Sequence, residues 1–191
     1  MKNLIIYAHP NETSFNESIK QCALTSLQKN GEVRLRDLYA NQFNPILKND
    51  YYNSFAPTDM PDELIAEQAE ITWADNLVFI FPTWWAGMPA ILKGYFDRVF
   101  TNGFAFRMSD NKMEGLLKNK KAVILQTTGL SAESMKPNQL VTSMKTILTV
   151  GIFDPCGIEI LTHKFLYSVP YIDNEARREM LMEVEDVLAI F

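Results

Sequence analysis

The chain is poor in the side chains that build disulfide frameworks and metal centres, with two cysteines and two histidines in 191 residues. Two thiols cannot form a framework, so we expect Cys22 and Cys156 to be reduced in a cytoplasmic protein. No cluster of histidine, cysteine and carboxylate has zinc-ligand spacing, and no metal site is expected. The Gly-x-Ser-x-Gly elbow of the α/β-hydrolases is also missing. These absences argue against a disulfide scaffold, a zinc enzyme and a serine hydrolase.

The usual phosphate-binding motifs are missing as well. Neither Gly-x-Gly-x-x-Gly nor Gly-x-x-x-x-Gly-Lys-Ser/Thr occurs, so the dinucleotide fingerprint and the P-loop are excluded. The formal net charge of −5 disfavours binding to a phosphate backbone, and we expect no nucleic-acid partner. The longest uncharged stretch, residues 76–92, contains two prolines and a glycine and is too short to cross a membrane. We therefore expect a cytoplasmic protein without an integral membrane segment.

The sequence does contain apolar runs that alternate with segments of helical periodicity. Residues 4–8 and 77–81 are short apolar runs without polar alternation, which is typical of strands buried on both faces. The predicted strands are residues 4–8, 32–37, 77–81, 121–127 and 157–161. The predicted helices are residues 14–28, 62–74, 89–101 and 138–150, and a last helix bearing Leu181, Val184, Leu188 and Phe191 on one side. This alternation predicts an α/β protein with a parallel sheet, formed by residues 1–191 as a single domain.

In such a sheet, ligands bind beyond the carboxyl ends of the strands, near a switch in strand order. The first strand is followed by His9 and then by Thr13, Ser14 and Asn16 at a predicted helix N-terminus. The free N–H groups and the positive end of the helix dipole suit a phosphate there. The alternative is an ordinary capped helix, for which Ser14 and Glu17 form a capping-box pattern.

Two further loops follow strands at the same edge. The third strand ends at Pro82 and is followed by Trp84 and Trp85, whose indoles can stack on a planar ligand or cap the core. The fourth strand runs into Thr128 and Gly129, which allow close backbone approach to a ligand but also suit an ordinary turn. Together the three loops form a pocket with a phosphate end and a flat aromatic end, which matches the shape of a flavin nucleotide.

At these residues the chain resembles the NAD(P)H:quinone oxidoreductases of the flavodoxin-like superfamily, including bacterial drug-modulator and potassium-efflux-ancillary relatives. The resemblance covers nearly the whole chain. The segments that carry it are residues 7–9, 13–16, 37–40, 43–45, 66–68, 81–94, 96–100 and 127–129. It implies a flavodoxin-like three-layer αβα sandwich with strand order 2-1-3-4-5. It also implies a tightly bound flavin at the interface of a homodimer.

The resemblance assigns site residues position by position. The implied cofactor-binding residues are His9, Ser14, Phe15, Asn16, Ser18, Gln68, Pro82, Thr83, Trp84, Trp85, Ala86, Thr127, Thr128, Gly129, Leu130 and Arg177. Arg177 matches a position that contacts the nucleotide tail in members carrying FAD, so FAD is favoured and FMN is the alternative. Phe106 and Met108 fall where the family places substrate-pocket residues. Catalysis is assigned to backbone N–H groups at Gly129 and Leu130, which would stabilise negative charge on the reduced flavin.

The sequence also departs from the family pattern. A Tyr and a His proposed to stabilise the reduced flavin in the animal enzymes are replaced by Met135 and Val141, and an aromatic residue is replaced by Ala86. The implied activity is a two-electron, ping-pong transfer from NAD(P)H to a quinone or a related flat acceptor. Alternatives are an azo- or nitroreductase, a flavodoxin-type electron carrier and an ion-channel regulatory subunit. Basic loop residues, among them Lys118 and Lys120, argue against the carrier.

Overall fold

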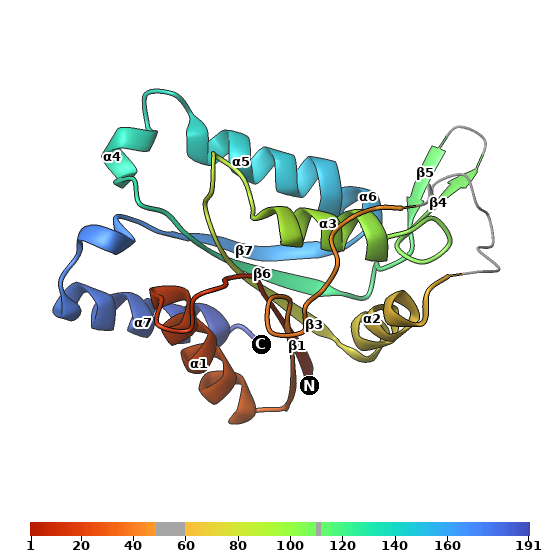
Figure 1. Cartoon of the computed structure of the whole chain (residues 1–191), viewed down its shortest axis with the longest axis horizontal. Helices are drawn as coiled ribbons and strands as arrows, with labels where there is room; N and C mark the ends of the chain where they lie inside the picture. Colours follow the sequence, from red (N-terminus) through yellow and green to blue (C-terminus); the bar gives the residue numbers. More distant parts are fainter. Residues whose placement is uncertain (49–59, 110–111) are drawn as a thin grey trace.

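The computed structural model describes residues 1–48, 60–109 and 112–191, and its centre is a five-stranded parallel sheet (Figure 1). The strand order is β2-β1-β3-β6-β7, which confirms the predicted order 2-1-3-4-5 for the main strands. These strands are β1 (Lys2–Tyr7), β2 (Glu32–Asp37), β3 (Asn76–Pro82), β6 (Lys121–Thr127) and β7 (Glu159–Leu166). The order switches direction between β1 and β3, so their carboxyl ends mark the expected ligand edge.

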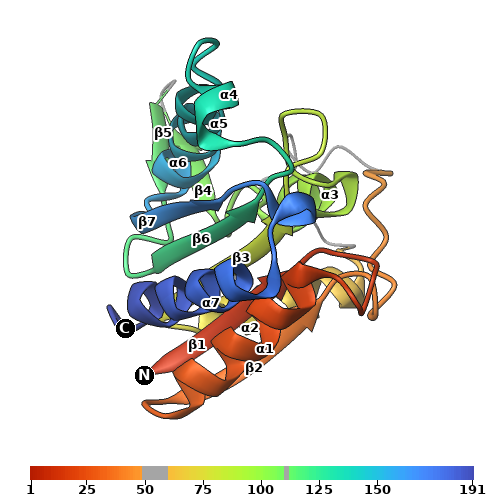
Figure 2. The same ribbon diagram turned by 90° about the vertical axis from the view of Figure 1, so that its left-hand side faces the viewer.

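Helices cover both faces of the sheet, and the side chains of each central strand alternate between them. Leu4 and Ile6 of β1 belong to one buried cluster with residues of α2 and α3, whereas Ile5 and Tyr7 pack with α1 and α7. Figure 2 shows α1 and α7 together on their side of the sheet. The longer helices are α1 (Phe15–Gln28), α2 (Asp62–Trp73), α3 (Ala90–Val99), α5 (Leu140–Leu148) and α7 (Asn174–Leu188).

Ser14 starts α1 as the sequence predicts. Its backbone is extended, and its hydroxyl oxygen accepts a hydrogen bond from the Glu17 N–H at 3.2 Å. The reciprocal half of the predicted capping box is absent from this helix end, because the Glu17 carboxylate pairs with Lys20 at 2.7 Å and the Ser14 N–H donates to the carbonyl of Asn11. The helix start is therefore fixed by a single side-chain cap.

Three predicted segments differ from the structure. Residues 102–119 contain an antiparallel hairpin, β4 (Phe106–Ser109) with β5 (Lys112–Gly115), whose four-residue strands are too short to show a pattern. The helix expected over 138–150 continues beyond α5 as a π-helical turn, Thr149–Phe153, and α6 (Asp154–Cys156). Strand β7 extends to Leu166, because an edge strand need not be uniformly apolar. A short helix, α4 (Ala132–Met135), and a 3-10 turn, Val169–Tyr171, are the remaining elements of the described residues.

Lys120 is a buried loop residue that is 4% exposed. Its ammonium donates to the carbonyl oxygens of Thr72, in the last turn of α2, and of Ala74, directly after it, so it caps the end of this helix. The predicted irregular segment 41–61 lies partly outside the described residues. Cys22 and Cys156 are free thiols, as predicted. No helix within the described ranges is long and apolar enough to cross a membrane.

Candidate functional site

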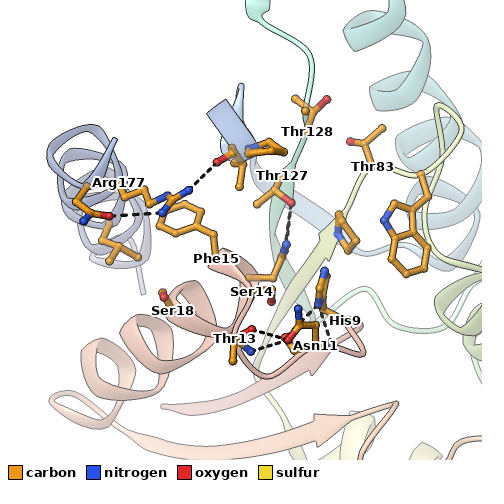
Figure 3. Close-up of a pocket in the computed structure, with 18 of the residues that line it drawn as sticks. His9, Asn11, Thr13, Ser14, Phe15, Ser18, Thr83, Thr127, Thr128 and Arg177 are labelled. Atoms are coloured by element: carbon orange, nitrogen blue, oxygen red, sulfur yellow. Dashed lines mark hydrogen bonds between the residues drawn. The ribbon is translucent and has the colours of Figure 1, made fainter. Parts of the chain in front are cut away.

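A cavity of about 820 Å³ opens at the carboxyl ends of β1, β3 and β6, where the sequence places its three loops (Figure 3). This volume is within the range of small-molecule and cofactor sites. Twelve of the sixteen residues proposed to bind a cofactor line it. They are His9, Ser14, Phe15, Asn16, Ser18, Pro82, Thr83, Trp84, Thr127, Thr128, Gly129 and Arg177.

One end of the cavity is the loop that enters α1. The Asn11 side-chain oxygen accepts hydrogen bonds from both the Thr13 N–H and the Thr13 hydroxyl, each at 2.8 Å, which orders the loop as an Asx turn (Figure 3). The N–H groups of Phe15 and Asn16 lie in the first helical turn and have no intrahelical acceptor. With the positive end of the helix dipole, they make this end suited to an anion.

Two arginines of α7 add positive charge to the same end. Arg177 and Arg178 line the cavity because α7 packs beside α1. The Arg177 guanidinium makes long contacts of 3.4 Å with the Val169 carbonyl and 3.5 Å with the Asn174 side chain (Figure 3). Its Nε is buried without a hydrogen-bond partner among the residues that the structure describes. A buried donor of this kind leaves hydrogen-bonding capacity for an anionic ligand.

Asn16 and Thr127 connect the two ends of the cavity. The Asn16 Nδ2 donates to the Thr127 Oγ1 at 2.9 Å, and each residue is 3% exposed. The bond joins the first turn of α1 to the carboxyl end of β6, more than a hundred positions away in the sequence. It therefore fixes the distance between the anion-binding end and the Thr127–Gly129 wall.

His9 and Trp84 stand at the aromatic end, with ring centroids 6.1 Å apart. The His9 Nδ1 accepts from the Asn11 N–H at 3.1 Å, and burial lowers the pKa of this imidazole below its usual value. His9 is thus a neutral ring near neutral pH. Together with Trp84, it gives this end a flat and uncharged lining.

The loop after β3 forms a tight turn in which Trp84 and Gly87 exchange two backbone hydrogen bonds. Trp85 and Ala86 at its centre have φ values of 50° and 57°, in the left-handed region that side-chain-bearing residues seldom adopt. Trp84 is 40% exposed and Trp85 fully exposed, so the alternative that this pair caps the core was wrong.

The backbone of the Thr127–Gly129 wall is already largely paired. The Thr128 N–H donates to the Leu166 carbonyl at 2.9 Å, and the Leu130 N–H donates to the Thr128 hydroxyl at 3.2 Å. Gly129 lines the cavity, and its N–H has no acceptor within the described parts of the chain. Of the two N–H groups assigned to catalysis from the sequence, Gly129 is therefore the one available to a ligand.

Six other predicted residues lie outside this cavity. The Gln68 amide donates to the Val99 carbonyl and to the Thr101 hydroxyl, at the C-terminal end of α3. Phe106 is 4% exposed and belongs to the core cluster beneath α3, whereas Met108 is 40% exposed on the hairpin. The remaining three, exposed on loops, are Trp85, Ala86 and Leu130.

Thr13, which the sequence places at the helix N-terminus suited to a phosphate, also lines the cavity. The cavity contains six residues that sequence reasoning did not select: Asn11, Val169, Pro170, Asn174, Arg178 and Leu181. Asn11 lies inside a loop that the sequence marks, so its polarity was an available indication. The other five belong to the segment from the 3-10 turn into α7. They reach the cavity only through the packing of α7 beside α1.

Comparison with known proteins decides the family. A model of the flavodoxin-like fold matches residues 1–188. The chain belongs to the flavodoxin-like fold family. Within it, the chain is 37% identical over 183 residues to an uncharacterized NAD(P)H oxidoreductase of Haemophilus influenzae, covering 95% of this chain and 91% of the relative. It is 36% identical over 199 residues to NAD(P)H dehydrogenase [quinone] 1 of Cavia porcellus, covering 93% of this chain and 72% of that protein.

The solved structures agree with this placement in the flavodoxin-like family. The NAD(P)H:quinone oxidoreductase of Methanothermobacter marburgensis superposes with a TM-score of 0.89 at 28% identity, covering 98% of this chain and 97% of that one. An azoreductase of Bacillus anthracis has a TM-score of 0.78 at 20% identity over the full length of both chains, which shows a shared fold alone. The resemblance to quinone oxidoreductases inferred from the sequence is thereby confirmed.

Proposed function

We propose that the protein is a flavin-dependent NAD(P)H:quinone oxidoreductase. The observation that carries this proposal is one cavity with an anion-binding end, at α1 and Arg177, and a flat, uncharged end at His9 and Trp84. A flavin nucleotide has the same two parts, a phosphate and a planar ring. The unpartnered Arg177 Nε and the free first-turn N–H groups fit the phosphate, and the Thr83 and Gly129 walls fit the polar edge of the ring.

A bound flavin would supply two-electron transfer, so that NAD(P)H and a proton reduce a quinone to a hydroquinone and leave NAD(P)⁺. The chain's own residues bind and orient. Ser14, Ser18 and Arg177 would hold the phosphate, while Pro82 and Trp84 would set the plane of the ring. The Gly129 N–H would place a hydrogen-bond donor where negative charge develops, which is the form of stabilisation that lowers such barriers most effectively.

We further propose that FAD is the flavin and that the chain works as a cytoplasmic homodimer. Arg177 supports FAD because it adds a cation near the phosphate end, with Arg178 beside it. Trp85, Met108 and Leu130 support the dimer, since all three are exposed apolar side chains near one edge of the cavity or on the hairpin. A second protomer would cover them and complete the site for a flat acceptor.

Steady-state kinetics tests the shared site for NAD(P)H and quinone. If both occupy the same space in turn, initial rates at several quinone concentrations give parallel double-reciprocal lines. Intersecting lines contradict a single site. Azo compounds and nitroaromatics, assayed in the same way, measure the alternative acceptors, and the proposal expects them to have lower kcat/KM than quinones.

A further inference from the structure

Three polar side chains form a hydrogen-bonded series from strand β7 to the cavity wall. The His163 Nε2 lies 2.9 Å from the Gln126 Oε1, and the Gln126 Nε2 lies 2.8 Å from the Thr83 Oγ1. Gln126 is 1% exposed between the two, and Thr83 lines the cavity beside Thr128 (Figure 3). The function described above does not require Gln126 or His163.

The surroundings of Gln126 fix the direction of these hydrogen bonds. The Met144 Sδ lies 3.5 Å from the amide nitrogen, and a thioether sulfur can only accept a hydrogen bond. The amide NH₂ therefore faces Met144 and Thr83, and the amide oxygen faces His163. That oxygen accepts, so the proton of the imidazole is on Nε2.

The other nitrogen of His163 agrees with this direction. Its Nδ1 is buried and has no partner in the part of the chain that the structure describes. A buried lone pair without a partner is tolerated more readily than a buried N–H without one, which favours the Nε2–H tautomer again. Burial and the nearby Lys145 lower the pKa of His163 to about 3, so the ring is neutral near pH 7. It also stacks on Phe165, with centroids 4.6 Å apart.

The direction of these hydrogen bonds determines whether the Thr83 hydroxyl can donate to a ligand. Its oxygen accepts from Gln126, so its own proton is free for another acceptor, and the open side of Thr83 is the cavity. We propose that His163 and Gln126 are positioning residues that hold the Thr83 hydroxyl as a hydrogen-bond donor to a carbonyl oxygen or an unprotonated ring nitrogen of the bound flat ligand. The identification of that ligand as a flavin rests on the proposed function.

Met135 and Val141, which replace the family's Tyr and His, have no O–H or N–H side-chain donor. Met135 is 1% exposed, and its sulfur lies 3.9 Å from the Thr128 hydroxyl, beneath the wall. Thr83, directly after β3, supplies a side-chain donor to this end of the cavity.

The first test measures flavin affinity of the full-length chain after its flavin has been removed, by titration with FAD and with FMN. Thr83→Val keeps the shape and removes the donor, and we expect a dissociation constant about tenfold higher. Thr83→Ser restores the hydroxyl and should return to within about threefold of wild type. Gln126→Leu frees the hydroxyl to turn, so a smaller loss of affinity and a shifted flavin absorption band are expected. Thr83→Ala replaces the valine variant if that variant does not fold.

The second test does not depend on flavin. Nitrogen-15 NMR of the histidines in the full-length chain should show His163 as the Nε2–H tautomer, and Gln126→Leu should shift its resonances. A proton on Nδ1 overturns the proposed direction. Wild-type affinity in Thr83→Val, or equal loss in the valine and serine variants, overturns the donor role and leaves the oxidoreductase proposal intact. A wild-type chain that binds no flavin overturns both proposals.

Discussion

The Asn16 amide nitrogen lies 2.9 Å from the Thr127 hydroxyl oxygen, in a buried hydrogen bond between two residues that line the cavity. It joins the helix start that would hold a phosphate to the strand end that would face a ring. The relative position of the two ends is thus set by the protein before any ligand binds, which is the condition for preorganised binding.

Breaking this bond should affect stability and binding together. Asn16→Leu and Thr127→Val each remove one partner of a buried hydrogen bond, and we expect each to lower the free energy of unfolding by about 1–3 kcal/mol. Denaturant unfolding of both single variants and the double variant gives the coupling between the residues. A coupling of about 1 kcal/mol is expected, whereas strictly additive losses contradict a direct bond.

Arg177 should distinguish the two flavins. If its guanidinium meets the nucleotide tail, Arg177→Met raises the dissociation constant for FAD about tenfold or more and changes that for FMN less. Arg107→Met, on the exposed hairpin strand β4, is the matched control for loss of one positive charge. Equal losses for FAD and FMN assign Arg177 to the shared phosphate, and no loss for either removes it from the site.

Trp85 should matter for function without mattering for the fold. Its side chain is fully exposed, so Trp85→Ala should change the free energy of unfolding by less than about 0.5 kcal/mol. We expect weaker flavin retention or slower turnover, since an indole held at a positive φ beside Trp84 serves stacking rather than packing. Trp73→Ala is the control for loss of an indole away from the cavity. Trp73 ends α2, and the Arg34 guanidinium lies over its ring. Wild-type flavin retention and turnover in Trp85→Ala exclude Trp85 from the site.

His163, whose Nδ1 is buried, should make the fold sensitive to acid. Its pKa is about 3 when folded against an ordinary 6.5, so below pH 6.5 the unfolded chain binds a proton that the native chain does not. Stability therefore falls as the pH is lowered from 6.5 towards 3, by up to about 1.4 kcal/mol per pH unit from this group. The comparison of wild type with His163→Gln isolates it from the carboxylates. If the difference in unfolding free energy between the two is constant from pH 7 to pH 4, the histidine is not buried in its neutral form.

The sequence predicts the sheet well because its central strands are governed by local composition. Residues 4–8 and 77–81 are apolar without alternation, and both runs are buried on two faces as that pattern requires. The loops that follow them are recognisable for the same reason, since a strand end fixes where each loop must lie. Most of the cavity at β1, β3 and β6 could thus be located in advance.

The parts that could not be predicted depend on long-range packing. Val169, Asn174 and Arg178 reach the cavity only because α7 lies against α1, and no local pattern records that contact. Likewise, Gln126 reads as an isolated polar residue in an apolar strand. Its meaning becomes visible only when β7 brings His163 alongside it.

The most direct test of the oxidoreductase account is an anaerobic absorbance titration of the purified chain with NADPH, followed by a simple quinone. The account predicts that a bound flavin bleaches in one two-electron step and that the quinone restores its absorbance. Heating then releases the flavin for identification as FAD or FMN. A flavin that does not respond to nicotinamides, or one that is reduced through a stable one-electron form, contradicts the account and indicates an electron carrier.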